Sequence, residues 1–203
     1  MSEINHGSNM HEHYKRGWVT EIFPKHQSDK PGQRKSRRGV KSIVRLGSKV
    51  ENIRNHRPDI FIDKGPVTWL DGSGRPLDSL LYDAAANGID CRGTYDLVAL
   101  NHYPLRSLGS YLVKMFRGDV VVNDKQVSQR YWRTRNKHDT FTVTFQENQI
   151  AKALSYYEKL ISDAKLLALH KKSCVNHEDR IKKLLKIPDF ITRKEWIFAE
   201  AWK

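Results

Sequence analysis

Residues 95–118 read Tyr-Asp-Leu-Val-Ala-Leu-Asn-His-Tyr-Pro-Leu-Arg-Ser-Leu-Gly-Ser-Tyr-Leu-Val-Lys-Met-Phe-Arg-Gly. The apolar run from Tyr95 to Leu100 is typical of a short buried strand, and Pro104 prevents that strand from continuing. From Ser107 onward, apolar residues recur three and four positions apart, which predicts a helix capped by Ser107 and ended by Gly118. A strand, a polar Asn-His-Tyr triplet and a helix carrying cations form a unit suited to hold an anionic ligand.

The sequence on either side of this unit predicts an α/β (or α+β) domain over residues 1–145 and a helical tail over residues 146–203. Strands are expected over residues 40–46 and 50–53, and a basic loop over about residues 25–39. Apolar residues keep helical spacing from 146 to 172 and predict one amphipathic helix there. A second helix is expected to begin at Asn176, whose side chain is a good N-cap.

Composition limits the class of protein. The chain is 38% hydrophobic, enough for a core, and its two cysteines are far apart in sequence, which argues against both a disulfide framework and a zinc cluster. No stretch resembles a signal peptide or has the length needed to span a bilayer. We therefore expect a soluble, cytoplasmic protein, with peripheral attachment to the inner membrane as a further option.

The excess of Lys and Arg over Asp and Glu, 36 to 23, gives a net charge of +13. Such an excess favours anionic partners, namely nucleic acid, phosphorylated small molecules or an anionic membrane surface, without choosing among them. Aromatic rings and guanidinium groups alternate in Tyr131-Trp132-Arg133-Thr134-Arg135. This cluster can stack a base or clamp a phosphate, and it can equally anchor the fold under arginine stems.

Several short motifs resemble elements of bacterial family 2-type glycosyltransferases. In the central unit, Asn101-His102-Tyr103, Ser107, Tyr111, Lys114 and Arg117-Gly118 are similar to that family's "NHY", Ser, aromatic, Lys and "RG". Four further likenesses follow the family's order along the chain: residues 6–11 to "FGS-x-GH" with residues 19–23 to "VTE-x-F", residues 40–45 to "K-x-IVR", residues 55–58 to "H-x-P", and residues 131–136 to "YW-x-x-RN". His6 and Met10 depart from it, replacing an aromatic residue and a glycine.

The resemblance implies a fold and an activity. It covers residues 6–136 and implies the C-terminal part of a GT-A-like mixed sheet with helices, followed by the amphipathic tail. Such enzymes transfer a sugar from a nucleotide-sugar donor to a glycan or lipid-linked acceptor. The Asp-x-Asp motif of their donor-binding half does not occur in this sequence. We therefore expect a fragment, half of a split enzyme or a repurposed remnant, inactive alone and completed by a missing N-terminal half.

The resemblance also assigns roles to individual residues. It places His102 on a divalent cation, Mn²⁺ or Mg²⁺, and Lys114 and Arg117 at the donor phosphates. A second group is assigned to the acceptor side or the cleft: His11, Glu21, His56, Tyr131, Trp132 and Arg135. No catalytic base is assigned, because the usual carboxylate would lie upstream. An alternative for His102 is a hydrogen bond with a purely structural role. An alternative for Lys114 and Arg117 is that they are ordinary surface charges.

Two other functions stay open at this stage. The net charge and the Tyr131–Arg135 cluster allow a nucleic-acid-binding protein, although the basic residues form no known binding module. A non-catalytic remnant that docks a partner through its C-terminal helices is the third option. An apolar stripe on those helices would then favour association if it is not buried within the chain.

Overall fold

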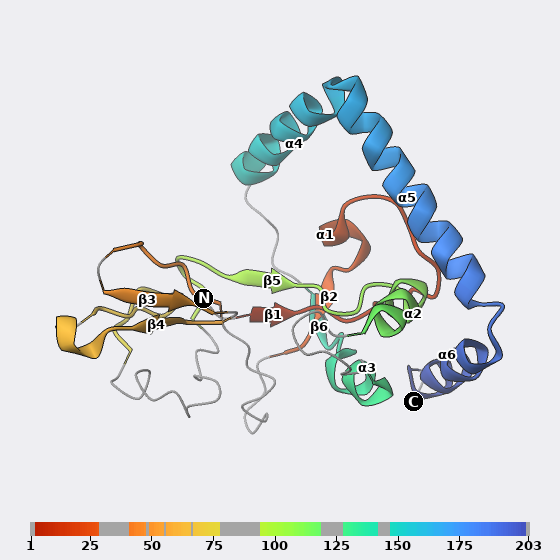
Figure 1. Ribbon diagram of the computed structural model, residues 1–203, viewed down its shortest axis with the longest axis horizontal. Coiled ribbons are helices and arrows are strands. Elements are labelled where there is room, and N and C mark those ends of the chain that lie inside the picture. The colour runs from red at the N-terminus through yellow and green to blue at the C-terminus, as the bar shows by residue number, and fades with distance from the viewer. Residues whose placement is uncertain are drawn as a thin grey trace. The chain divides into compact units, whose positions relative to one another are not determined.

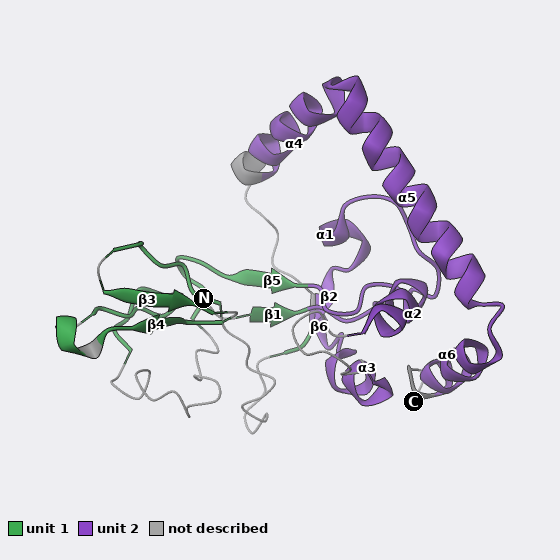
Figure 2. Ribbon diagram, viewed as in Figure 1, with its two compact units in different colours: residues 1–5, 27–102 green, residues 6–26, 103–203 purple. Residues whose placement is uncertain are grey.

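The computed structural model describes residues 3–28, 41–47, 49–54, 56–65, 67–77, 94–118, 128–141 and 147–201 (Figure 1). The chain divides into two compact units (Figure 2). Unit 1 contains residues 1–5 and 27–102, and unit 2 contains residues 6–26 and 103–203. This division interleaves N-terminal and C-terminal segments and thus differs from the boundary expected near residue 145.

Unit 1 is built from short strand pairs. Strands β1 (Glu3–Asn5) and β5 (Leu100–His102) are parallel, with Glu3 opposite Leu100 and Asn5 opposite His102. Strands β3 (Val50–Ile53) and β4 (Pro58–Ile60) are antiparallel and precede the short 3₁₀ helix η2 (Ile62–Lys64). The parallel pair places the ends of two distant segments at one edge, because parallel strands finish on the same side.

Unit 2 is mainly helical. Its small antiparallel pair joins β2 (Lys25–His26) to β6 (Thr140–Phe141). The helices are α1 (Val19–Ile22), α2 (Leu108–Arg117), α3 (Gln129–Arg135), α4 (Glu147–Ser162), α5 (Ala164–Leu184) and α6 (Pro188–Ala201). A hydrophobic core joins α2, α3, α5 and α6: Leu105, Leu108, Tyr111, Leu112, Met115, Trp132, Leu184 and Ile197. Mixed helices and small sheets confirm the α/β or α+β class.

Helix α2 confirms the prediction made from its spacing and caps. The Ser107 hydroxyl oxygen accepts a hydrogen bond from the Ser110 amide, and Gly118 ends the helix at φ 80°, a left-handed value that favours glycine. Two further first-turn amides are already satisfied, because Leu108 N donates to His11 O and Gly109 N donates to Glu12 O. The N-terminus of α2 is therefore closed by backbone carbonyls, which does not suit it to bind an anion.

Two strand predictions are wrong. The strand expected over residues 95–100 is instead β5 at residues 100–102, because the amides of Leu97 and Val98 donate to Gly72 O and wrap this segment around a turn. Residues 41–46 are described and form no regular element. Ile43 and Leu46 are 78% and 69% exposed there, so these apolar side chains are not packed into a core. Residues 29–40, most of the expected basic loop, lie outside the described residues.

The helical tail is divided differently from the prediction. The expected helix over residues 146–172 is interrupted at Asp163, whose carboxylate caps α5 by accepting from Lys165 N and Leu166 N. Asn176 lies inside α5 rather than at the start of a new helix. Helix α6 then begins at Pro188, a residue suited to the first helical position. None of the helices in the described part of the chain combines the length and the apolar character needed to cross a membrane.

Candidate functional site

Three polar side chains meet at the β1–β5 edge of unit 1. His102 Nδ1 lies 3.0 Å from Glu3 Oε2 and 3.0 Å from Asn5 Oδ1. Glu3 and Asn5 alternate with Ile4 along the strand and so project to one side, where the parallel register brings His102 opposite Asn5. The Glu3 side chain is only 2% exposed, whereas the His102 side chain is 35% exposed. A buried carboxylate thus holds a half-buried imidazole.

The two contacts fix which imidazole nitrogen carries the proton. Both atoms that face His102 Nδ1 are oxygens that accept hydrogen bonds, so Nδ1 carries the proton and donates. In the neutral ring, Nε2 is then the basic nitrogen, with a lone pair for a cation or a proton. A carboxylate on the far nitrogen is the usual support of a metal-ligating histidine, because it fixes the tautomer and raises the basicity of the ring.

The donor set fits a divalent cation only in part. Within the described residues, no group of three or more His, Cys, Asp or Glu side chains is arranged to hold a metal ion. The trio offers one nitrogen ligand, His102 Nε2, with Glu3 and Asn5 already engaged on the opposite nitrogen. His102 therefore fits the role of a single protein ligand to an ion whose other ligands come from elsewhere.

In unit 2, the two residues expected at the donor phosphates, Lys114 and Arg117, have different surroundings. Lys114 is partly buried, and its Nζ donates to Pro104 O at 2.8 Å and to Tyr131 Oη at 3.4 Å. Its ammonium also lies 4.5 Å from the centre of the Tyr131 ring. Arg117, one turn further along α2, is exposed. Lys114 thus ties α2 to the Pro104 loop and to α3, while Arg117 faces solvent.

The aromatic cluster of α3 contains a partly buried ring and a fully buried one. Tyr131 packs against the core, and its ring also contacts Lys114 and the Arg135 guanidinium, which is 5.6 Å from the ring centre. Trp132 is only 2% exposed and packs 4.9 Å from Tyr111 between ring centres. Because Trp132 is part of the core, its expected place in an acceptor cleft does not match its burial. Tyr131 and Arg135 stay together at the edge of α3.

The remaining residues assigned to the cleft belong to both units. His11 belongs to unit 2, where its Nε2 lies 2.9 Å from Ile22 O and its ring packs edge-on against Phe23. Glu21 is exposed on the short helix α1. His56 is an exposed residue of unit 1 whose carbonyl accepts from the Ser42 hydroxyl. His11 therefore has a clear structural contact, whereas Glu21 and His56 are exposed.

Residues 6–11 carry the first family-like motif and pack against residues 136–137, at the C-terminal end of α3. Ser8 N donates to Asn136 Oδ1 at 2.8 Å, and a Cβ on Gly7 would lie 2.5 Å from Lys137 O. Asn9 and Met10 both have left-handed backbones, with φ of 50° and 62°. The Asn9 side chain stabilises this turn by bonding Gly7 O and both backbone groups of Lys25. Position 10 thus has a conformation that favours glycine.

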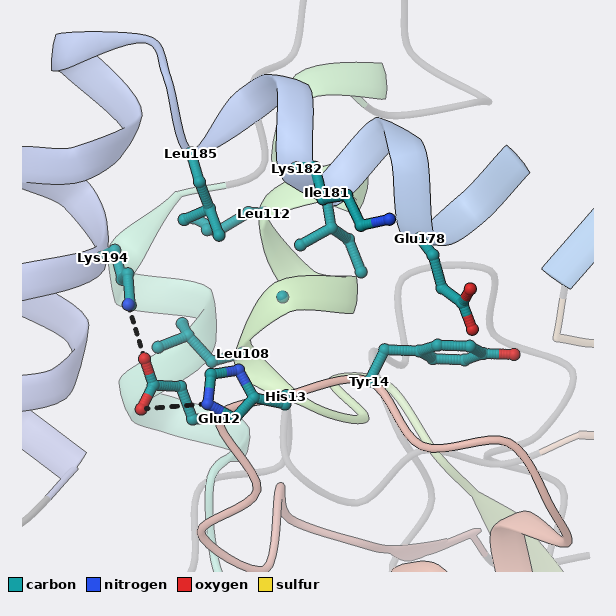
Figure 3. Close-up of a pocket in the computed structure, with 11 residues that line it drawn as sticks. Glu12, His13, Tyr14, Leu108, Leu112, Glu178, Ile181, Lys182, Leu185 and Lys194 are labelled. Carbon is teal, nitrogen blue, oxygen red and sulfur yellow. Dashed lines mark ion pairs between the residues drawn. The ribbon is translucent and has the colours of Figure 1, made fainter. Parts of the chain in front are cut away.

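A small pocket lies where α2, α5 and the segment 12–14 meet, with Lys194 of α6 at its rim (Figure 3). Its volume is about 210 Å³, and its lining includes Leu108, Gly109 and Ile181. At the rim, Glu12 pairs with Lys194 and lies 3.9 Å from His13. The hydrogen bond from Lys194 lowers the pKa of Glu12. Because its rim carries paired charges of both signs, the pocket has no clear preference for an anion or a cation.

A chain of hydroxyl groups joins α2 to α5 beside this pocket. The Ser107 hydroxyl donates to Ser110 Oγ, and Ser110 Oγ lies 3.0 Å from His177 Nε2. Burial lowers the pKa of His177, and the nearby charge of Arg106 lowers it further. His177 therefore accepts the Ser110 proton as a neutral imidazole.

Sequence reasoning missed Glu3, Asn5 and His177. The alternation of polar Glu3 and Asn5 around Ile4 is a weak strand signal, and nothing local links it to a histidine ninety-nine residues away. His177 lies among charged residues in the middle of a helix, where an exposed position is the ordinary expectation. These partners emerge only from tertiary contacts.

Comparison with known proteins adds no family. No protein-family model, no curated protein and no solved structure matches this chain. Function therefore rests on the geometry and on the motif resemblance.

Proposed function

We propose that this chain is part of a GT-A-type glycosyltransferase, which moves a sugar from a nucleotide-sugar donor to a glycan or lipid-linked acceptor. The observation that carries the proposal is the hydrogen bond between His102 Nδ1 and the buried Glu3 carboxylate. It lies where two parallel strands end, and ligands of α/β sheets bind outside that edge. The motif resemblance gives this histidine a role, as ligand to the divalent ion of the donor.

The chemistry explains why such a ligand is useful. Cleavage of a nucleotide sugar releases a diphosphate, whose developing negative charge must be stabilised. A bound Mn²⁺ or Mg²⁺ would supply that stabilisation. His102 would bind the ion through Nε2, and Glu3 would hold the ring in the tautomer that leaves Nε2 unprotonated. Asn5 Oδ1 also accepts from His102 Nδ1 and so helps Glu3 to hold the ring.

The cations of α2 have different proposed roles. Arg117 is exposed and suited to contact phosphate oxygens through its planar guanidinium. Lys114 already donates to Pro104 O and Tyr131 Oη, so we assign it to positioning α2 and α3 rather than to the phosphates. Tyr131 and Arg135 remain candidates for the acceptor side, and Trp132 is assigned to the core.

Packing within unit 2 supports the resemblance from a second direction. Three of the motifs that carry it contact one another: Ser8 bonds Asn136, His11 O accepts from Leu108 N, and Lys114 bonds Tyr131. The left-handed φ of Met10 falls where the family motif has glycine. A chance match of short motifs would not be expected to bring them together or to reproduce a backbone requirement.

The alternatives have less support. Nucleic-acid binding through the Tyr131–Arg135 cluster would need exposed rings for base stacking, and Trp132 is buried. We also propose that the chain does not transfer sugar by itself, because it contains no Asp-x-Asp motif. Sugar transfer by the isolated chain, supplied with Mn²⁺ and a panel of nucleotide sugars, would refute that part of the proposal.

Calorimetric titration with UDP and GDP tests the proposal directly. We expect binding of at least one nucleotide, weak because the Asp-x-Asp motif is absent, to require Mn²⁺ and to be lost in His102→Ala. His13→Ala removes a histidine that is 83% exposed and should leave binding unchanged. Binding that ignores Mn²⁺, or that survives His102→Ala, would contradict the proposed role of His102.

A further inference from the structure

Helix α5 has one face that packs and one that does not. Its packing face contacts α2: Ile181 lies against Gly109, where an added Cβ would be 3.2 Å from the Ile181 side chain, and His177 bonds Ser110. Cys174 and Leu184 are buried on the same face. The spacing of these residues, three and four apart, defines a single stripe along the helix.

The opposite face of α5 carries a line of lysines. Lys165, Lys172 and Lys183 are all exposed and are separated by seven and eleven residues, close to whole numbers of helical turns, so they share one side. Lys183 follows Ile181 by two residues, which rotates it about 200° away from the packing stripe. The lysine line therefore faces away from α2 along most of the helix length.

The acidic groups of α5 do not neutralise this line. Glu178 forms a bidentate pair with Arg16, with N–O distances of 2.7 and 2.8 Å. Asp179 lies within the line, seven residues after Lys172, and its carboxylate pairs with Lys182 at 3.2 Å. Lys186, just past the C-terminal end of α5, is a further exposed cation. Both acidic side chains are thus engaged by neighbouring cations, and the face, with three lysines against Asp179, keeps a net positive charge that favours an anionic partner.

Apolar side chains lie on both sides of the lysines. Leu169 is 54% exposed and Val175 is 43% exposed, and by helical spacing they flank the line on opposite sides. Exposed lysines on a helix are attracted to anionic lipid headgroups, and aliphatic side chains beside them can reach the acyl boundary. Single-stranded nucleic acid is usually held by aromatic stacking as well as by charge, and α5 contains no Phe, Tyr or Trp.

We infer that the outer face of α5 docks on an anionic lipid bilayer, with its lysines at the headgroups and Leu169 and Val175 at the acyl boundary. The helix lies flat on the membrane and does not enter it. Because the attraction is mainly electrostatic, binding falls steeply as the salt concentration rises.

Vesicle flotation with the full chain tests this inference. The vesicles contain phosphatidylcholine, either alone or with about 30 mol% phosphatidylglycerol, at roughly 0.1 M salt. We expect flotation only with the anionic vesicles. Charge reversal along the line, by Lys165→Glu, Lys172→Glu and Lys183→Glu, should weaken vesicle binding by at least about tenfold. The neutral triple replacement of the same lysines by Gln is measured alongside, so that unfolding is not mistaken for lost docking.

A matched triple variant separates the face from the net charge. Lys15→Glu, Arg45→Glu and Lys64→Glu change exposed cations outside α5 and lower the net charge equally. They should reduce vesicle binding by less than about twofold. Equal losses in both reversed variants, or no flotation of the unmodified chain, would overturn the inference. So would tighter binding to single-stranded RNA than to the vesicles, with the same α5 lysines required.

Discussion

The imidazole Nδ1 of His102 lies 3.0 Å from the Glu3 carboxylate, although ninety-nine residues separate the two in sequence. The contact depends on the parallel pairing of β1 with β5 and buries the carboxylate almost completely. A carboxylate in this position leaves His102 Nε2 as the basic nitrogen. It therefore links the fold of unit 1 to the proposed metal-binding role.

Glu3→Gln should weaken Mn²⁺ binding at His102 by about tenfold, the usual effect of losing the carboxylate behind a metal-ligating histidine. The amide keeps the shape of the side chain but carries no charge to support the ring. Electron paramagnetic resonance of free Mn²⁺ measures the affinity. Glu12→Gln is the matched control, because Glu12 pairs with Lys194 in unit 2. If both variants bind Mn²⁺ equally well, the Glu3–His102 contact has no role in metal binding.

Gly7→Ala should destabilise the protein by about 2–3 kcal/mol, since its Cβ would lie 2.5 Å from the Lys137 carbonyl oxygen and force the backbones apart. Gly47→Ala is the matched control, because no atom lies within 4 Å of the Cβ it would introduce. That variant should be neutral or slightly more stable. Urea unfolding of both proteins measures the difference, and equal stabilities would refute the close packing of residues 6–11 on residues 136–137.

Met10→Gly should stabilise the protein by about 0.5–1 kcal/mol. The left-handed backbone at φ 62° costs a residue with a Cβ about 1–2 kcal/mol, and glycine returns part of that as unfolded-state entropy. Met10 is 42% exposed, so little packing is lost. Met10→Ala keeps the Cβ and should give no gain. A Met10→Gly protein that unfolds at lower urea than Met10→Ala would show that no such strain exists.

Stability should fall as the pH drops below about 6.5, the ordinary pKa of histidine. Burial lowers the pKa of His177, and it also lowers the pKa of His138. In the window between these lowered values and 6.5, the unfolded chain binds more protons than the folded one, so acid favours unfolding. Urea unfolding midpoints are compared at two pH values. The loss of stability at the lower pH should be smaller for His177→Gln than for the unmodified protein. For His13→Gln, the loss of stability on acidification should match that of the unmodified protein. Equal losses in the two variants would contradict a contribution from His177.

The parts of the fold that the sequence predicted are those determined by local signals. Helix α2 follows from the spacing of its apolar residues, the Ser107 cap and the glycine at 118. The helical character of the tail follows from similar spacing. Its division does not, because apolar residues continue at helical spacing across Asp163. There the break depends on one carboxylate accepting from the Lys165 and Leu166 amides.

The parts that could not be predicted depend on distant partners. The apolar run 95–99 looks like a buried strand, yet its amides bond the Gly72 carbonyl and Leu97 is exposed. His102 was singled out as part of the polar triplet, and the family-like motif gave it a metal-binding role. Its partners Glu3 and Asn5 could not be found, because only the pairing of β1 with β5 brings them to it. The burial of Trp132 was equally invisible, since an aromatic–arginine alternation fits a surface cluster as well as a core anchor.

Paramagnetic broadening by Mn²⁺ tests most directly whether His102 is a metal ligand. Imidazole signals of the histidines are recorded by NMR with UDP or GDP present while Mn²⁺ is added in small amounts. We expect the His102 signals to broaden first, and Glu3→Gln to delay this broadening to higher Mn²⁺ concentration. Broadening of exposed His13 before His102, or no selective broadening at all, would contradict the assignment of His102 as the metal ligand.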